Sequence, residues 1–312
     1  MEQEQEHGQL IRLYADVATV QVGDRMVECT IRGKLFRTDP PAVGDFVRIE
    51  QVGEGHAIVE LLPRRTVLAR RAAGKVVRKQ VLIANVDQVI VVFSVVQPQF
   101  NAATLDRFLV VAEANNLVAL IVINKMDLAR EDSEAVTLEH AGIRSTMRMY
   151  EDAGYPVHYT SVQADMGMAE LREALAGKES VFVGPSGVGK SSLLNTLYPG
   201  LNLKVGRVSE AYGKGRHTTV GGYITRLPDG ASVADTAGLR EVGLWLIPPN
   251  ELPDCFPEFR PIMDNCRFSD CAHLAEPGCA VRAAVEAGDI AQSRYESYVK
   301  LRAEATEAWP RW

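Results

Sequence analysis

The sequence predicts an α/β protein in which a parallel-sheet domain lies between a small N-terminal β-barrel and a short, largely helical C-terminal domain. Three observations predict this: alternating apolar stretches early in the chain, buried strand patterns that alternate with helical ones from residue 81, and a Pro-rich break after Pro248. The 312 residues are 46% hydrophobic and 24% charged, an ordinary composition for a chain that buries a core. We expect a barrel at 1–66, a basic linker at 67–80, the parallel-sheet domain at 81–248 and the last domain at 249–312.

The charge pattern is uneven, although the net charge of -6 gives no reason to expect nucleic acid. Residues 61–86 contain no Asp or Glu but carry Arg64, Arg65, Arg70, Arg71, Lys75, Arg78 and Lys79. This basic stripe is either a solvated linker or a surface for RNA. The acidic N-terminus does not resemble a secretory signal, and apolar runs such as LVALIVI are too short to span a bilayer. We therefore expect a cytoplasmic protein without a membrane partner. We also expect a monomer.

The N-terminal region carries the pattern of a small barrel. The stretches VATVQV, MVECTI, FVRIE and HAIVELL alternate in hydrophobicity, and the turn pairs Gly23-Asp24, Gly44-Asp45 and Gly53-Glu54 separate them. This spacing predicts about five antiparallel strands. We favour an OB-like barrel, while an SH3-like barrel would show the same alternation.

The middle region alternates strands with helices. VIVVFSV, LVALIVI, VHYTSV and SVFV predict buried strands, and ATLDRFLVVAEANN and MAELREALA predict helices between them. Near-continuous Val and Ile runs separated by helices indicate a parallel sheet covered on both faces. After Pro248, AVRAAVEAG and the stretch from Asp289 to Trp309 predict two helices, with Asp289 as the N-cap of the second.

A phosphate-binding loop is predicted at GPSGVGKS, residues 184–191, between the strand SVFV and the helix SSLLNTL. The glycines allow backbone N–H groups to turn toward phosphates at a helix N-terminus. Lys190 should reach the β and γ phosphates, and Ser191 should bind Mg²⁺. The nucleotide-binding residues predicted in this segment are Gly184, Ser186, Gly187, Val188, Gly189, Lys190, Ser191 and Ser192.

A guanine-binding turn is predicted at NKMD, residues 124–127, which follows a buried strand at the carboxyl end of the sheet. Asp127 can accept hydrogen bonds from the N1–H and the exocyclic amine of guanine, an edge that adenine lacks. Asn124 can contact the base edge and hold neighbouring loops, and the stem of Lys125 can pack over the ring. YTSVQ supplies a second base loop, in which the backbone N–H of Ser161 should lie near the guanine carbonyl.

Switch elements are predicted downstream of the phosphate loop. DTAG, residues 235–238, follows the strand ASVA, so Asp235 can bind Mg²⁺ through water and the Gly238 N–H can meet the γ-phosphate. The glycine-spaced stretch between these motifs contains a threonine pair, and Thr219, or else Thr218, should complete the Mg²⁺ shell. The base motifs thus precede the phosphate motifs, which is a circular permutation joined near 177–180.

This order, with the stretches GPSGVGKSSLLN, GRHTT, DTAGLREVGLW and NAATLDRFL, resembles the circularly permuted GTPases of the RsgA (YjeQ) family. The resemblance covers essentially the whole chain and departs at Ala237, where the family usually has Pro. It implies an OB-fold, a permuted GTPase domain and a zinc domain, and action on the small ribosomal subunit and its rRNA late in assembly. A permuted GTPase for the large subunit is disfavoured by the barrel and by the cysteine cluster described below.

Hydrolysis is expected to need help, because Leu239 occupies the position where Ras-like enzymes have a water-orienting Gln. His217 or a group from a partner could supply it, and the resemblance implies both. We assign His217, Lys190 and Thr219 as catalytic. We predict a GTPase that releases from the subunit on hydrolysis, and the alternative is an RNA-binding assembly factor with GTP as a structural ligand.

The last domain contains a predicted metal site. Cys266, Cys271, His273 and Cys279 have the spacing C-x4-C-x-H-x5-C, which matches one closed, structural Zn²⁺ site. Clustered cysteines in a cytosolic chain favour a metal over disulfides. Cys29 and Cys255 lie outside the cluster and are interpreted as ordinary buried thiols.

Overall fold

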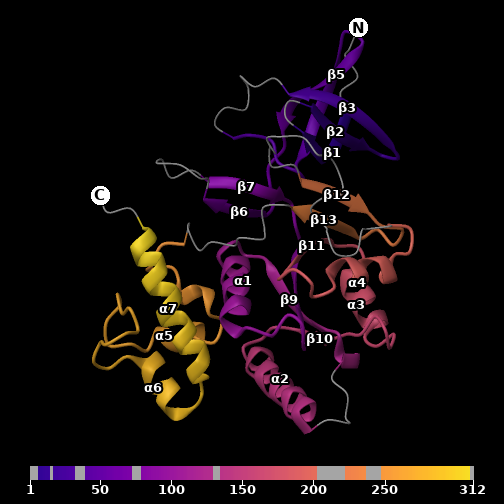
Figure 1. The fold of residues 1–312 in the computed structure, drawn as a ribbon. Coiled ribbons are helices and arrows are strands. Elements are labelled where there is room, and N and C mark those ends of the chain that lie inside the picture. Colours follow the sequence, from indigo (N-terminus) through magenta and orange to yellow (C-terminus); the bar gives the residue numbers. More distant parts are fainter. Residues whose placement is uncertain are drawn as a thin grey trace.

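The structure is a computed structural model that describes residues 6–14, 17–31, 39–71, 79–128, 134–201, 222–236 and 247–309. Figure 1 shows the barrel at the top, the parallel sheet with its helices below it, and the C-terminal helices at the lower left. The predicted order of the three parts is thus confirmed along the chain. None of the helices in the described ranges is long and apolar enough to cross a membrane.

The barrel is a closed, five-stranded structure of the OB type. Its strands are β1 (Glu6–Tyr14), β2 (Val17–Val22), β3 (Arg25–Ile31), β4 (Phe46–Val52) and β5 (Gly55–Leu61). They pair in the order β1-β2-β3-β5-β4, and the pairing of β1 with β4 closes the ring. This Greek-key order fits the OB-fold expectation rather than the SH3-like alternative. One feature differs from the prediction, because β3 and β5 run parallel.

The central domain has a six-stranded sheet covered on both faces. Its strand order is β10 (Val157–Tyr159), β9 (Val118–Asn124), β8 (Gln88–Ser94), β11 (Glu179–Val183), β13 (Ser232–Thr236) and β12 (Gly222–Arg226), with β12 antiparallel at the edge. Successive residues of β8 point to opposite faces of the sheet and pack in different hydrophobic cores. Val91 packs in the core that includes α1 (Ala102–Ala114), whereas Val92 packs in the core that includes α3 (Met168–Leu175) and α4 (Lys190–Leu197). The described part of this domain also contains α2 (Glu134–Asp152) and a short 3-10 helix (Met126–Leu128).

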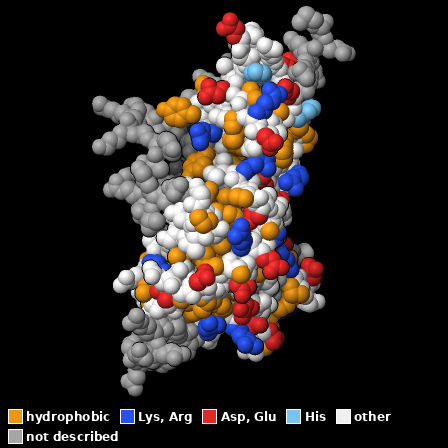
Figure 2. All heavy atoms as spheres, turned by 90° about the vertical axis from the view of Figure 1, so that its right-hand side faces the viewer, with side chains coloured by type: hydrophobic (Ala, Val, Ile, Leu, Met, Phe, Trp, Pro, Cys, Tyr) orange, Lys and Arg blue, Asp and Glu red, His pale blue; other side chains and the backbone are white. Residues whose placement is uncertain are grey.

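The stretch predicted to be a basic linker begins and ends in strands. β6 (Val67–Arg71) and β7 (Lys79–Ala84) pair antiparallel as a two-stranded sheet. Arg64 is held by Asp45 and Asp39, each at 2.6 Å, and Arg65 lies 3.5 Å from Asp87. The charge of Arg64, which is 13% exposed, is therefore neutralised within the protein, whereas the Arg65 side chain remains 63% exposed. On the face seen in Figure 2, acidic and basic side chains are intermixed rather than segregated.

The barrel and the central sheet are joined edge to edge. β1 pairs antiparallel with β12, with Arg12 opposite Tyr223, so one 11-stranded sheet runs through both parts. The guanidinium of Arg226 on β12 donates to the side-chain oxygens of Gln9 (2.6 Å) and Gln21 (3.0 Å) in the barrel. The barrel thus contacts the strand that follows the predicted threonine pair.

The C-terminal domain is mainly helical and packs against α1. It contains a short 3-10 helix (Pro253–Cys255), α5 (Arg260–Met263), α6 (Ala280–Ala287) and α7 (Gln292–Ala308). The prediction that Asp289 caps the last helix is wrong, because the N-cap of α7 is Ala291. Gly288 ends α6 in the left-handed region, and the Asp289 N–H donates to the Ala284 carbonyl at 2.9 Å. Asp289 therefore belongs to the C-terminal cap of α6.

Candidate nucleotide and metal sites

The phosphate loop has the geometry that its glycines predict. It connects β11 to α4, whose N-cap is Gly189. Gly184 and Gly189 have φ values of 129° and 99°, and a Cβ on Gly184 would lie 2.0 Å from the carbonyl oxygen of Val92. Only glycine fits such positions without strain. Lys190 Nζ lies over the loop and donates to the carbonyls of Gly184 and Pro185, each at 2.7 Å.

Asn124 joins the base turn to the phosphate loop. It is 2% exposed, and its side-chain amide donates to the Val188 carbonyl at 2.9 Å. The hydroxyl of Thr160 donates to the Asn124 Oδ1 at 3.1 Å, which orients the amide. A Cβ on Gly189 would lie 2.4 Å from the Asn124 Nδ2. The two motifs therefore converge although their order in the chain is reversed.

The second base loop holds Asp127 through the side chain of Ser161. The Ser161 hydroxyl donates to Asp127 Oδ1, and the same hydroxyl accepts from the Ala164 N–H at 3.0 Å. The Ser161 N–H donates to the Met166 carbonyl at 3.0 Å. This differs from the prediction, in which the same N–H faces the guanine carbonyl. Ser161 orients the aspartate instead.

The loop at residues 95–100 also borders the site, although its sequence did not predict this. Lys125 Nζ donates to the Gln97 carbonyl at 2.6 Å, and Pro98 is the nearest neighbour of a Cβ built on Gly187, at 3.8 Å. Residues 95–100, between β8 and α1, thus touch both motifs. The signal that could have found them is their place after a central strand, because ligands bind at the carboxyl ends of parallel strands.

The remaining residues of the predicted phosphate loop differ in their exposure. Val188 is fully buried and Ser191 is 5% exposed, whereas Ser186 and Gly187 are exposed and Ser192 is half-buried. Asp235 lies in β13, beside the strand β11 that leads into the loop, and its side chain lies outside the described part. His217, Thr218, Thr219, Ala237, Gly238 and Leu239 lie outside the described residues.

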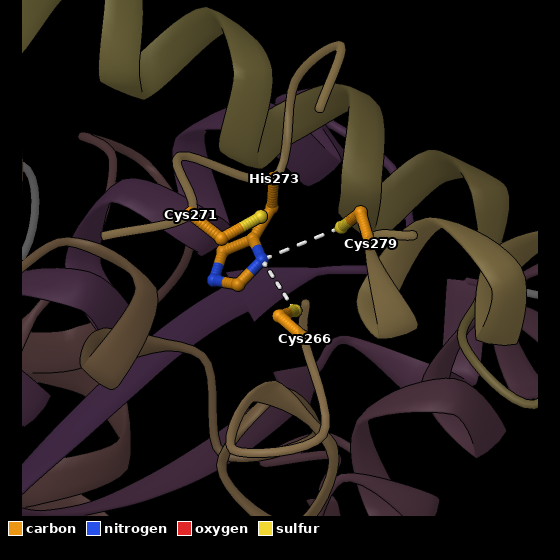
Figure 3. Close-up of side chains that lie close together, drawn as sticks. All are labelled: Cys266, Cys271, His273 and Cys279. Atoms are coloured by element: carbon orange, nitrogen blue, oxygen red, sulfur yellow. Dashed lines mark hydrogen bonds between the residues drawn. The ribbon is translucent and has the colours of Figure 1, made fainter. Parts of the chain in front are cut away.

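The cysteine cluster is assembled as predicted (Figure 3). The donor atoms of Cys266, Cys271, His273 and Cys279 all lie within 4.8 Å of one another. His273 Nδ1 lies 3.5 Å from the sulfurs of Cys266 and Cys279. Metal–ligand distances of about 2.0–2.3 Å in a tetrahedron give ligand separations of roughly 3.5–3.8 Å, so the set fits a closed metal site.

The environment of the cluster suits ligation. Burial lowers the pKa of His273, which keeps the imidazole neutral, and burial with the neighbouring thiols raises the pKa of Cys271 to about 12. Metal binding would reverse the second effect, because a coordinated thiol loses its proton. Cys29 and Cys255 are 1% and 4% exposed and lie outside the cluster, as expected.

Two tyrosines and one glutamate fix the loop that carries the ligands. Tyr295 and Tyr298 of α7 donate to the carbonyls of His273 (2.7 Å) and Ala272 (2.6 Å). The Glu276 carboxylate accepts from the N–H groups of Ala272, Leu274 and Ala275 at 2.8–3.0 Å. Burial alone would raise the pKa of Glu276, but these N–H donors outweigh it and lower the pKa to about 2. These contacts hold the ligand loop against α7.

The convergence of a guanine-type turn on a phosphate loop, in reversed chain order on a parallel sheet, defines a circularly permuted P-loop GTPase. The chain belongs to the RsgA GTPase family, whose sequence profile matches residues 61–245. The small ribosomal subunit biogenesis GTPase RsgA of Gemmatimonas aurantiaca is 51% identical over 269 residues, which cover 84% of each chain. Its namesake from Moorella thermoacetica is 43% identical and covers 95% of this chain and 96% of its own.

Solved structures agree with this assignment. The crystal structure of YjeQ from Thermotoga maritima has a TM-score of 0.77 and 37% identity, over 97% of this chain and 99% of its own. The circularly permuted GTPase YloQ has a TM-score of 0.74 and 32% identity, over 99% and 98%. The predicted fold class and enzyme class are thereby confirmed.

Proposed function

We propose that this GTPase acts in the cytoplasm in maturation of the small ribosomal subunit, binding the subunit and its rRNA and leaving when GTP is hydrolysed. The names of relatives that match it over most of both chains support the pathway. The proposal that the protein binds GTP rests on one observation. The Asn124 side chain donates a hydrogen bond to the Val188 carbonyl, and this contact joins the base motif to the phosphate motif.

In this proposal Asp127, held by Ser161, accepts from the guanine edge, and Asn124 and Lys125 shape the pocket. Lys190 neutralises the β and γ phosphates, and the backbone of the phosphate loop cradles them. Ser191, Thr219 and Asp235 hold Mg²⁺ directly or through water, and Gly238 meets the γ-phosphate.

The assignment of Asp127 as the guanine-binding residue is tested by replacing its carboxylate with an amide, which can donate a hydrogen bond where the carboxylate accepts one. Asp127→Asn should weaken GTP binding and gain affinity for xanthosine triphosphate, because xanthine presents an acceptor where guanine has an amine. Ser161→Ala should weaken GTP without creating that preference. Titration of both variants with GTP, ATP and xanthosine triphosphate checks this, and wild-type protein that binds ATP as tightly as GTP would refute the assignment.

His217 is proposed to orient the attacking water, since Leu239 has no group that could do so. His217→Ala should abolish subunit-stimulated turnover and leave GTP affinity unchanged, whereas His217→Gln should retain part of the turnover. Unchanged stimulated turnover in His217→Ala would remove this histidine from the mechanism.

The alternative is an RNA-binding assembly factor with GTP as a structural ligand. The rate of phosphate release distinguishes it from a subunit-stimulated GTPase. Phosphate release should rise on addition of purified small subunits, and a group supplied in trans contributes on the order of 10³–10⁵ in rate. Sedimentation with small and large subunits, in GDP and in a non-hydrolysable GTP analogue, shows which subunit is bound and in which state. Absence of any stimulation would favour the alternative.

The Cys₃His cluster is proposed to bind one structural Zn²⁺, because three thiolates and one imidazole close a tetrahedron and leave no position for a substrate. We further propose a monomer that works without a membrane. Elemental analysis of protein purified without added zinc tests the metal, and light scattering tests the oligomeric state.

A further inference from the structure

An exposed aromatic side chain lies on the loop that carries the metal ligands. Phe268 falls between Cys266 and Cys271, and it is 41% exposed. The guanidinium of Arg267 lies over its ring, 5.5 Å from the centroid. Neither side chain belongs to the core or to the four metal donors. The arrangement presents a π-face together with a planar cation at the surface.

The backbone on both sides of Phe268 is fixed by hydrogen bonds. The Arg267 N–H donates to the Gly278 carbonyl at 3.0 Å, and the Cys271 N–H donates to the Phe268 carbonyl at 3.3 Å. Gly278 has a φ of 74°, and a Cβ there would lie 3.1 Å from the Arg267 Cβ, so the arginine stem packs flat on this glycine. The pair is therefore held in place before any partner arrives, which lowers the entropy cost of binding.

The loop is also anchored at its far end and faces outward. Tyr295 and Tyr298 tie residues 272–273 to α7, while Arg294 of the same helix points to α1. In Figure 1 the orange loops of the C-terminal domain lie on the side of that domain away from the parallel sheet. An extended partner can reach Phe268 without disturbing the nucleotide site.

The surroundings of Phe268 decide what kind of partner fits. Apart from Leu274, which is 42% exposed, the exposed residues near Phe268 in the sequence are polar: Asp264, Asn265, Ser269 and Asp270. A protein interface needs a contiguous apolar core, which this loop lacks. One flat aromatic ring with a guanidinium suits a single unstacked nucleobase, because bases stack on aromatic and guanidinium planes and the cation attracts the adjoining phosphate.

We propose that Arg267 and Phe268 form a stacking site for an unpaired base of single-stranded RNA. This inference rests on the proposed function, in which the partner is an RNA-rich particle, and it adds a contact that the GTPase site does not require. Phe268 supplies the ring, and Arg267 supplies charge and a second stacking plane.

The test uses full-length zinc-loaded protein and a fluorescein-labelled single-stranded oligoadenylate about 12 nucleotides long, within the site size of one binding module. Phe268→Ala should lower its affinity about 5- to 150-fold, as loss of one stacked base does. Phe268→Trp should retain affinity, and its added tryptophan emission, relative to wild type, should be quenched by the oligonucleotide. Leu274→Ala is the matched control, because Leu274 is 42% exposed on the same loop and should bind as wild type does.

The zinc content and the melting temperature of each variant are measured to check that the loop remains folded. Unchanged oligonucleotide affinity in Phe268→Ala, or an equal loss in Leu274→Ala, would overturn the stacking site. A loss of subunit binding with intact oligonucleotide binding would also overturn it, and would assign Phe268 to a ribosomal protein. If wild-type protein bound the oligonucleotide through Phe268 but ignored small subunits, the proposed function would fail and the stacking site would stand.

Discussion

The side-chain amide of Asn124 donates a hydrogen bond of 2.9 Å to the carbonyl oxygen of Val188, 64 positions further along the chain. This contact spans the two motifs whose order is reversed. It is possible because Gly189, the next residue, has no side chain where the Asn124 amide lies. Circular permutation has therefore left the spatial relationship of base turn and phosphate loop intact.

We predict that Gly189→Ala lowers the affinity for both GDP and GTP. The new Cβ would lie 2.4 Å from Asn124 Nδ2 and sit at a φ of 99°, so the amide must move away from Val188. Loss of this buried hydrogen bond should weaken binding about 5- to 150-fold, or about 1–3 kcal/mol. Titration with a fluorescent GDP analogue measures it. Gly200→Ala is the control, because nothing lies within 4 Å of a Cβ there, and equal affinities of the two variants would contradict the prediction.

A second prediction concerns the contact between the central and C-terminal domains. Arg294 of α7 is 1% exposed, and it pairs with Asp106 of α1, which is 2% exposed, and with Glu258 at 2.7 Å. Tyr150 of α2 donates to the same Asp106 at 2.8 Å. Arg294→Met would leave buried carboxylates without their cation, and should lower the free energy of unfolding by about 3–5 kcal/mol.

Denaturant titration checks the Arg294→Met prediction, with Arg107→Ala as the control. Arg107 also joins α1 to α7, through Glu304 at 2.8 Å, but this pair is partly exposed and should contribute only about 0–1 kcal/mol. Hydrogen exchange should locate the loss at α1 and α7. An Arg294→Met protein as stable as Arg107→Ala would show that the buried cluster does not hold the domains together.

The parallel sheet was predictable because its strands and the phosphate loop are local patterns. The unbroken apolar run before Asn124 and the loop around Lys190 specify their elements without reference to the rest of the chain. The metal cluster was predictable for the same reason, since its ligands lie between Cys266 and Cys279.

Contacts between distant segments were not predictable from one sequence. Nothing in the stretch around Gln97 shows that its carbonyl accepts from Lys125, because that contact depends on the relative placement of two loops. The pairing of β1 with β12 and the engagement of Arg64 by Asp45 are equally non-local. Asp289 was assigned to the wrong helix because an N-cap and a C-terminal cap compete for the same short connection.

A third prediction concerns pH. Burial raises the pKa of Glu179 at the start of β11, although Arg226 and the hydrogen bond from Gln9 oppose this. The folded state therefore binds the proton more tightly than the unfolded state, and the ionised carboxylate costs stability at neutral and alkaline pH. Glu179→Gln should thus be more stable than wild type at pH 8.

The difference between Glu179→Gln and wild type should shrink as pH falls toward the unperturbed carboxyl pKa of 4.5, where the wild-type side chain becomes neutral in the folded protein. Urea unfolding of both proteins across this range measures it. Glu286→Gln is the control, because the Glu286 side chain is 75% exposed and its replacement should leave the stability at pH 8 close to that of wild type. A stability difference for Glu179→Gln that stays constant with pH would show that ionisation of Glu179 does not matter.

The fourth prediction concerns removal of the zinc ion that we propose for the cysteine cluster. Binding free energies of about 10–16 kcal/mol for structural zinc exceed the stability of a small domain, so a chelator should unfold the ligand loop and loosen α7, which Tyr295 and Tyr298 tie to it. Hydrogen exchange should rise at residues 260–309, whereas GDP affinity should change little because the phosphate loop lies in another domain.

Cys266→Ala should lose the metal, and Cys255→Ala should keep it, because the Cys255 thiol lies outside the cluster and donates to the Glu251 carbonyl. Metal retained in Cys266→Ala would show that the cluster is not the binding site.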